Sequence, residues 1–156
     1  MRVLFVCTGN TCRSPLAEAI ARVVASRRQL VDVSFASAGT SAWEGAPASD
    51  GALLVGLERT LDLNAHRARQ LTRDIVEDAD LLLAMGPHHL ERIEALGGTG
   101  KAHLLTAYAS HGHDVRAITD PFGGDLEAYR SAADELEREV EGAVNRLAAG
   151  RPSGNP

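Results

Sequence analysis

Residues 3–15 read VLFVCTGNTCRSP: an apolar run that ends on Cys7, a short loop of small polar residues, and a helical pattern that opens near Pro15. This order predicts a strand, a loop of the size of a phosphate group and a helix N-terminus. Backbone N–H groups of such a loop and of the first helical turn converge on one point and favour an anion there. Arg13 adds a guanidinium whose parallel donors match two phosphate oxygens.

Cys7 lies at the base of this loop, where helix N–H groups and an arginine favour the thiolate, which is the nucleophilic form of cysteine. A nucleophile beneath donors for a developing oxyanion is arranged for phosphoryl transfer to sulfur. Asn10 is suited to hold the loop, because asparagine tolerates left-handed backbone, and Ser14 can donate to the sulfur. We expect the substrate to be bound by Thr8, Gly9, Asn10, Thr11, Cys12 and Ser14.

The segment from Cys7 to Pro15 resembles the signature loop of the low-molecular-weight protein tyrosine phosphatases, including their bacterial protein-arginine-phosphatase branch. The C-x5-R spacing alone occurs in other phosphatases. With Gly9, Asn10 and Ser14 in place directly after an N-terminal strand, the pattern is highly specific. The resemblance implies a cysteine-dependent phosphatase that needs neither a metal nor a cofactor.

Composition fits one folded domain over residues 1–150, followed by a disordered tail over 151–156. The chain has 44% apolar and 24% charged residues and a net charge of −5, which disfavours a general nucleic-acid binder. No apolar run is long enough to span a bilayer, and the N-terminal one is too short for a signal peptide. We therefore expect a cytoplasmic protein that acts on phosphorylated proteins and is inhibited by phosphate-like oxyanions.

Strand and helix patterns alternate along the chain and predict an α/β fold, a single-domain three-layer sandwich of about four parallel strands with helices on both faces. The strands are expected at residues 2–6, 31–36, 80–85 and 103–106. Helices are expected at about 15–28, 49–60 and 87–96, with a long amphipathic helix from residue 125 onward. The Cys7 loop should then lie at the carboxyl end of the first strand, where the order of the sheet reverses.

A leaving group must be protonated, and Asp120-Pro121-Phe122-Gly123-Gly124 is suited to supply the acid. Proline restricts Asp120 to extended conformations, and the glycines allow a close approach to the pocket. Alone, Asp-Pro favours an ordinary turn. Together with the Cys7 loop, the segment resembles the Asp-Pro acid loop of the family, so we interpret Asp120 as the general acid and Phe122 as part of the substrate pocket.

Two further residues gain roles from the resemblance. Family members carry a tryptophan on the rim of the active site, which suggests this role for Trp43, although an aromatic residue in such a loop also commonly packs as an anchor. A histidine that supports the phosphate loop corresponds to His66. Taken alone, a histidine beside a loop is usually structural.

The phosphorylated residue is indicated by two departures from the tyrosine phosphatases of the family. Their position before the second loop cysteine is commonly isoleucine, and their acid loop usually carries two aromatic residues. Here these positions hold Thr11 and Phe122-Gly123, which resemble the arginine-phosphatase branch. A threonine hydroxyl can hydrogen-bond a guanidinium, whereas isoleucine packs on a ring. We favour phosphoarginine, with a phosphotyrosine-specific enzyme as the alternative.

Other functions fit the sequence less well. Arsenate reductases share the loop but need further cysteines, and Cys7 and Cys12 are the only two here. A phosphate-binding module without turnover would not need Cys7, Arg13 and Asp120 together. A metal site is not favoured, because His88-His89 and His111/His113 lack further ligands. Cys12 is instead placed to capture oxidised Cys7 as a reversible disulfide.

Overall fold

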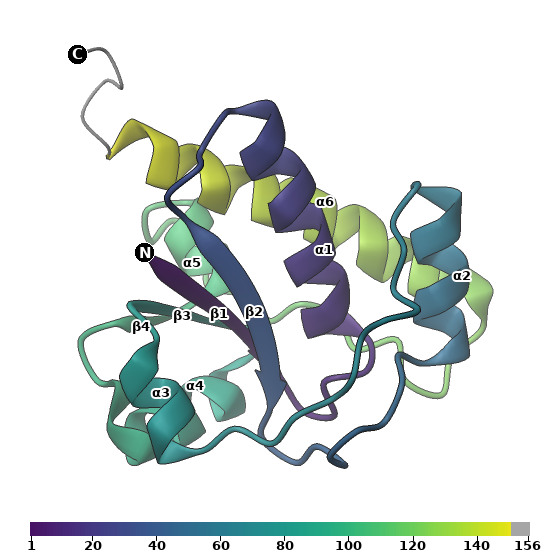
Figure 1. The fold of residues 1–156 in the computed structure, drawn as a ribbon, viewed down its shortest axis with the longest axis horizontal. Coiled ribbons are helices and arrows are strands. Elements are labelled where there is room, and N and C mark those ends of the chain that lie inside the picture. Colours follow the sequence, from purple (N-terminus) through teal and green to yellow (C-terminus); the bar gives the residue numbers. More distant parts are fainter. Residues whose placement is uncertain (151–156) are drawn as a thin grey trace.

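The computed structural model describes residues 1–150, so the tail expected at 151–156 lies outside the described residues. Within this part of the chain, one sheet contains four parallel strands in the order β2-β1-β3-β4 (Figure 1). The strands are β1 (Arg2–Cys7), β2 (Ser34–Gly39), β3 (Leu81–Ala84) and β4 (Ala102–Leu104). The parallel four-stranded sheet predicted from the alternation of apolar patterns is confirmed.

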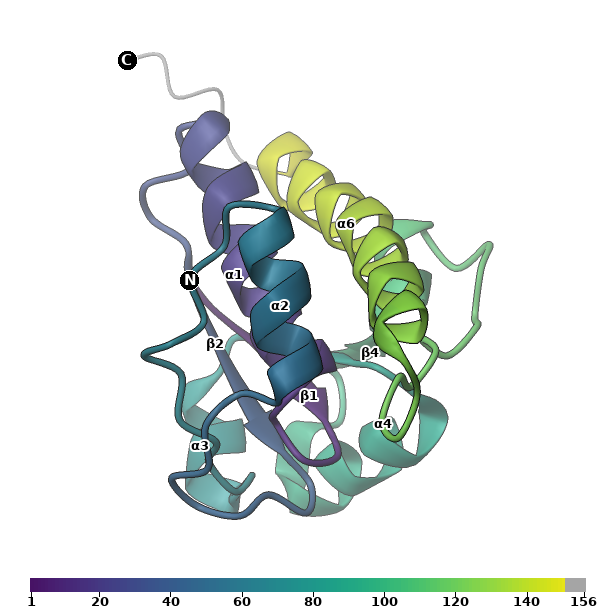
Figure 2. The ribbon, with the colours of Figure 1, turned by 90° about the vertical axis from the view of Figure 1, so that its right-hand side faces the viewer.

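Helices cover both faces of the sheet. On one face lie α1, α2, α5 and α6, and on the other lie α3 and α4 (Figure 1). Seen from the side in Figure 2, α1 and α6 run next to each other as one layer. The helices are α1 (Arg13–Arg27), α2 (Asp50–Glu58), α3 (Arg73–Asp78), α4 (Pro87–Ile93) with the short π-helical segment η1 (Glu94–Gly98), α5 (Leu105–Ala109) and α6 (Leu126–Ala149).

The first strand is the centre of the sheet, because it pairs with β2 on one side and β3 on the other. Its residues 3–7 are all buried, as expected for a strand covered on both faces. Since the chain leaves β1 toward α1 on one face and later returns to β3 on the other side, the order reverses beside β1. Ligands of open α/β sheets bind outside the carboxyl ends of strands at such a point, and Cys7 ends β1 there.

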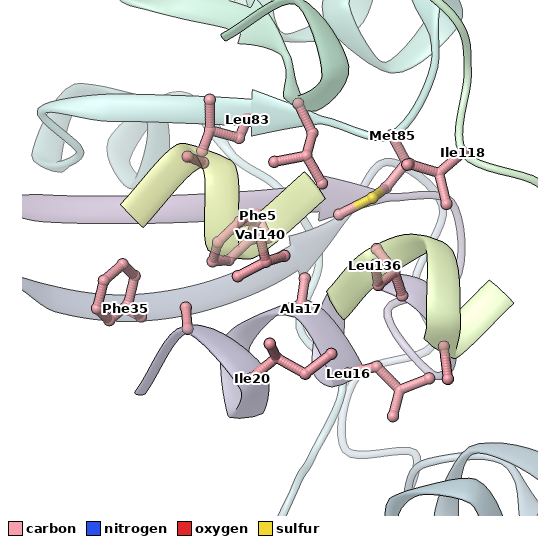
Figure 3. Packing of buried hydrophobic residues seen from close by; sticks show 14 of the residues in the cluster. Phe5, Leu16, Ala17, Ile20, Phe35, Leu83, Met85, Ile118, Leu136 and Val140 are labelled. Atoms are coloured by element: carbon pink, nitrogen blue, oxygen red, sulfur yellow. The ribbon is translucent and has the colours of Figure 1, made fainter. Parts of the chain in front are cut away.

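The larger core fills the space between the sheet and the α1–α6 layer (Figure 3). Phe5 and Leu83 project from the sheet toward Leu136 and Val140 of α6 and Leu16 of α1, and all five are almost completely buried. Burying a side chain of this size contributes roughly 1.5–3 kcal/mol to folding. This packing fixes where α1 begins, and therefore where the loop between β1 and α1 must run.

Helix caps match the sequence patterns. Asp125 accepts a hydrogen bond from Ala128 N at 2.9 Å and begins α6, and Ser49 accepts from Ala52 N at 3.3 Å and begins α2. The helix from Pro87 stops at Gly97, whose φ of 100° ends the segment at the predicted pair of glycines.

Of the helices in residues 1–150, none combines the length and the apolar character that a membrane span requires.

Two boundaries predicted from the sequence are wrong. The second strand covers 34–39 and not 31–36: Val31 is 93% exposed in a turn, and the strand continues through small residues to Gly39. The fourth strand ends at Leu104, and residues 105 and 106 already belong to α5, a helix that the apolar pattern did not indicate. Both errors come from short runs in which apolar alternation cannot distinguish a strand from its neighbours.

Candidate active site

The loop from Thr8 to Cys12 leaves β1 and turns into α1, as the sequence predicts. Asn10 lies in the loop with φ of 57°, a left-handed conformation that asparagine tolerates. Within residues 1–150, the backbone amides of residues 8 to 12 have no protein acceptor. Unpaired N–H groups at a helix N-terminus bind anions, so the loop can hold a phosphoryl group above Cys7.

Ser14 connects the sulfur of Cys7 to Asn10. The distance from Cys7 Sγ to Ser14 Oγ is 2.9 Å, and Asn10 Nδ2 donates to the same serine oxygen at 2.8 Å. Because the oxygen accepts from Asn10, the serine proton is available for the sulfur. Cys7, Asn10 and Ser14 are all buried, and a buried donor at this place stabilises negative charge on the sulfur.

Asn10 is held by groups from two other segments, the loop that carries His66 and Arg69 and the strand β2 that carries Ser37. Its Oδ1 accepts from Arg69 N at 2.9 Å, and its backbone oxygen lies 2.7 Å from His66 Nε2. Its Nδ2 also donates to Ser37 Oγ at 2.9 Å, and Ser37 in turn donates to Glu18 Oε1 at 2.7 Å. Since both amide hydrogens and the amide oxygen have partners, the orientation of the Asn10 side chain is fixed.

Arg13 connects the loop to the segment that carries Asp120. Its Nη1 donates to the backbone oxygen of Ile118 at 3.1 Å, and its Nη2 lies 3.4 Å from Asp120 Oδ2. The acid loop is anchored on its other side as well, since Ile118 N donates to Met85 O at 2.8 Å. Asp120 Oδ1 accepts from Phe122 N at 3.0 Å, which closes a local turn. Two segments separated by more than a hundred residues therefore meet at one guanidinium.

A pocket of about 460 Å³ opens over the loop and contains both Cys7 and Asp120. Trp43 and Phe122 line it, although both are largely exposed: the exposed fraction is 84% for Trp43 and 80% for Phe122. Trp43 therefore stands at the rim and is not packed as an anchor in the core. The lining consists of Cys7, Thr8, Gly9, Thr11, Cys12, Arg13, Ser41, Trp43, Asp120 and Phe122.

Cys12 lies at the side of the pocket among polar groups. Its sulfur is 3.1 Å from Ser49 Oγ and 3.7 Å from the hydroxyl of Tyr129. Both Cys7 and Cys12 are buried free thiols in this structure. Burial raises the pKa of Tyr129, so its hydroxyl remains protonated at neutral pH.

The sequence-based assignment needs one correction of detail. Asn10 and Ser14 are among the residues expected to bind the substrate, but their side chains are fully buried behind the loop and do not line the pocket, which leaves only the backbone of Asn10 for that role. Their side chains support Cys7 and the loop backbone instead. The other residues of the expected site do meet at the pocket, except His66, which contacts the loop from behind as the resemblance implied.

Sequence reasoning missed several supporting residues. Ser37 and Arg69 hold Asn10, and Glu18 accepts from Ser37. Ser41 lines the pocket, and His89 contacts Thr8. These residues come from distant parts of the chain, and no spacing in the sequence connects them to the loop.

Across residues 1–150, no group of three His, Cys, Asp or Glu side chains is arranged to hold a metal ion.

Comparisons with known proteins agree with this geometry. Residues 2–152 match the family described as "Low molecular weight phosphotyrosine protein phosphatase". The protein-arginine-phosphatase of Bacillus subtilis is 38% identical over 149 residues, covering 94% of this chain and 97% of that protein.

Two solved structures are also similar. One is a YwlE arginine phosphatase, a C7S mutant with a phosphorylated active-site serine. It has a TM-score of 0.90 and 35% identity over 97% of this chain and 98% of its own. The other, Vibrio vulnificus Wzb in complex with benzylphosphonate, has a TM-score of 0.83 and 27% identity, covering 94% of this chain and 98% of its own.

Proposed function

Because this chain belongs to the low molecular weight phosphotyrosine protein phosphatase family and is a protein phosphatase, we propose that Cys7 is its nucleophile, Arg13 its phosphoryl-binding cation and Asp120 its general acid. The observation that carries this assignment is that all three line one pocket, with Arg13 joined to Asp120. One similar structure is a C7S mutant whose active-site serine is phosphorylated, which supports Cys7 as the residue that carries the phosphoryl group.

In the first step, the Cys7 thiolate attacks phosphorus and the bond to the leaving atom breaks as the S–P bond forms. Arg13 and the amides of residues 8 to 12 hold the three equatorial oxygens while charge redistributes. Asp120 gives its proton to the leaving nitrogen or oxygen, so arginine departs as a guanidinium and tyrosine as a neutral phenol.

In the second step, water attacks the phosphorus of the cysteinyl phosphate. Asp120, now a carboxylate, takes the proton from water, and the S–P bond breaks to release inorganic phosphate. The electron pair returns to Cys7, where the Ser14 hydroxyl at 2.9 Å stabilises the thiolate as the leaving group. None of these steps requires a cofactor.

The phosphorylated residue is proposed to be arginine. Thr11 lines the pocket and offers a hydroxyl to the guanidinium nitrogens of a phosphoarginine. The acid loop contributes one aromatic residue, Phe122, so the pocket has fewer walls that reward a flat ring. The name of the Bacillus subtilis relative agrees with this assignment, while a phosphotyrosine-specific enzyme remains the alternative that the family description favours.

The test is turnover of two peptides of the same sequence, one with phosphoarginine and one with phosphotyrosine. The wild type is expected to prefer phosphoarginine, and Thr11→Ile is expected to shift the ratio of kcat/KM toward phosphotyrosine by about tenfold or more. Thr11→Val keeps the size of threonine without its hydroxyl, so it separates hydrogen bonding from shape. A ratio that is the same in wild type and Thr11→Ile would refute the role of Thr11.

The protein is proposed to act in the cytoplasm, with phosphorylated proteins as partners.

A pocket built to hold a phosphoryl group should also bind inorganic phosphate and related oxyanions, and a relative that binds benzylphosphonate supports this expectation. We expect competitive inhibition of the wild type by vanadate, and loss of vanadate binding to Arg13→Ala in calorimetry. A proposed Cys7–Cys12 disulfide would show as peroxide inactivation that thiols reverse in the wild type but not in Cys12→Ser.

A further inference from the structure

The ring of His89 supports the pocket from beneath. His89 lies on α4 and is completely buried, and its Nε2 is 2.8 Å from Thr8 Oγ1. Thr8 follows Cys7 directly and is exposed on the wall of the pocket. A buried residue of one helix therefore contacts the hydroxyl next to Cys7, although 81 positions separate the two residues in the sequence.

The protonation state of this ring follows from its surroundings. Burial, together with the nearby charges of His88 and Arg13, lowers the pKa of His89 to about 3, so the ring is neutral at pH 7. One nitrogen then carries a proton and the other does not. Nδ1 has no hydrogen-bond partner within residues 1–150, and a buried N–H without an acceptor is the rarer kind of unsatisfied group. The proton therefore belongs on Nε2, which donates it to Thr8.

The contact fixes the Thr8 side chain more than the loop backbone. The loop is already attached to the segment after β2, because Cys7 O accepts from Thr40 N and Thr8 O accepts from Ser41 N, both at 2.9 Å. A threonine side chain can still turn about χ1 and exchange its methyl and hydroxyl groups. Donation from His89 selects the rotamer in which the oxygen points toward α4.

We propose that His89 is a positioning residue that fixes the Thr8 hydroxyl as a polar contact for the phosphorylated side chain. With one lone pair of Thr8 Oγ1 taken by His89, the hydroxyl keeps its proton and a second lone pair for the pocket. A guanidinium N–H of the substrate can donate to that lone pair, and a phosphoryl oxygen can accept the proton. This inference rests on the proposed function of the pocket and adds a residue outside its lining.

Kinetics with a phosphoarginine peptide test the role through three variants. Thr8→Val removes the hydroxyl at constant shape, His89→Leu removes its donor, and the double variant removes both. A contact made equally in the ground state and transition state changes KM and leaves kcat unaltered. We expect each single variant to raise KM by about three- to tenfold with kcat within twofold, and the double variant to equal either single one.

Two further variants separate positioning from a structural role. His113→Leu changes an exposed histidine outside α4 and outside the pocket lining, and it should leave KM unchanged. His89→Gln retains an N–H near Thr8 and should recover part of the lost affinity. If His89→Leu instead lowers kcat and the melting temperature together while Thr8→Val behaves as wild type, His89 only stabilises the fold and the proposal is wrong.

A measurement without turnover keeps the proposal testable even if His89→Leu does not fold or the substrate assignment fails. Two-bond ¹H–¹⁵N spectra of the wild type at pH 7 should show the Nε2–H tautomer for His89. In Thr8→Val, the Nε2 resonance should shift because its acceptor is gone, while the resonances of His88 stay in place. The Nδ1–H tautomer in the wild type would overturn the proposal directly.

Discussion

Asn10 donates a hydrogen bond of 2.8 Å from its side-chain nitrogen to the hydroxyl oxygen of Ser14, and this direction decides where the serine proton goes. Because the oxygen is an acceptor for Asn10, its own proton is directed to Cys7 Sγ at 2.9 Å. The side-chain amide of Asn10 cannot flip, since its oxygen accepts from Arg69 N. The loop therefore contains a fixed chain of donors that ends on the proposed nucleophile.

Ser14→Ala should slow the breakdown of the cysteinyl phosphate. A hydrogen bond to a charged group contributes roughly 1.5–3 kcal/mol, which corresponds to a fall in kcat of about ten- to a hundredfold. Because the thiolate is the leaving group in the second step, the intermediate should accumulate. Rapid-quench detection of phosphoenzyme and a burst of p-nitrophenol from p-nitrophenyl phosphate measure this effect.

Ser41→Ala is the matched control for this experiment. Ser41 lines the same pocket, but no hydrogen bond to its side chain is formed within residues 1–150. The variant should keep the kcat of the wild type within about twofold. Equal kinetics in Ser14→Ala and the wild type would show that the serine proton does not act on the sulfur.

Gly39→Ala should damage both the fold and the loop. A Cβ at Gly39, where β2 ends, would lie 2.4 Å from Thr8 O and 3.0 Å from Asn10 N, both backbone atoms that cannot turn aside. We expect the free energy of unfolding to fall by about 1–3 kcal/mol. Urea denaturation measures this loss. Gly9→Ala is the control, because its Cβ would meet only Thr11 Oγ1 at an ordinary 3.5 Å, and its stability should be close to that of wild type.

Gly39 also shows what the sequence could and could not predict. The Cys7 loop is contiguous, so one window of sequence reveals the strand, the anion-binding loop and the helix that follows. Gly39 lies against that loop from another strand, β2. The end of β2 consists of small residues that show no apolar alternation, so the predicted strand ended too early, at residue 36. The position of Cys7 beneath the loop was predictable, whereas the backbone that supports the loop was not.

The same distinction holds for the residues around Asn10 and Thr8. Ser37 and His89 reach the loop from separate elements, and neither belongs to a recognisable spacing. His66 was assigned only because the family carries a histidine there. Asp120 lies between these cases, since Asp-Pro alone predicts a turn and gains a chemical role only in combination with Cys7. Residues of one contiguous motif can be recognised from the sequence, but the contacts that support them form only when the sheet has assembled.

The buried ring of His89 should make stability depend on pH. In the unfolded chain a histidine titrates near 6.5, while the pKa of His89 in the folded protein is about 3. Between these values the unfolded state binds more protons, so the free energy of unfolding falls as pH falls from 6.5 toward 3, by at most about 1.4 kcal/mol per pH unit. Urea denaturation at pH 7, 6 and 5 measures the slope.

His89→Leu removes this contribution, so its slope between pH 7 and 5 should be shallower than that of the wild type. His113→Leu, which alters an exposed histidine outside α4, should keep the wild-type slope. Parallel slopes in the wild type and His89→Leu would mean that the pKa of His89 is the same in the folded and the unfolded protein.

Asp120→Asn should reveal the acid through its dependence on the leaving group. Asparagine can still accept from Phe122 N, so the local turn that Asp120 Oδ1 closes is retained, but an amide has no proton to give. We expect kcat on a phosphoarginine peptide to fall by about 10²- to 10⁴-fold. On p-nitrophenyl phosphate the loss should be much smaller in the first step, because nitrophenolate leaves without protonation.

The contrast between the two substrates is needed because Asp120 also lies 3.4 Å from Arg13 Nη2. This ion pair joins a buried guanidinium to a half-exposed carboxylate, and its loss could reorient Arg13 and reduce turnover of both substrates alike. A burst of nitrophenolate at the wild-type rate, followed by slow release of phosphate, identifies Asp120 as the proton donor and acceptor. An equal loss of the burst rate and of peptide turnover assigns Asp120 to positioning Arg13 instead. Asp114→Asn, in the same segment but outside the pocket lining, should leave both rates unchanged.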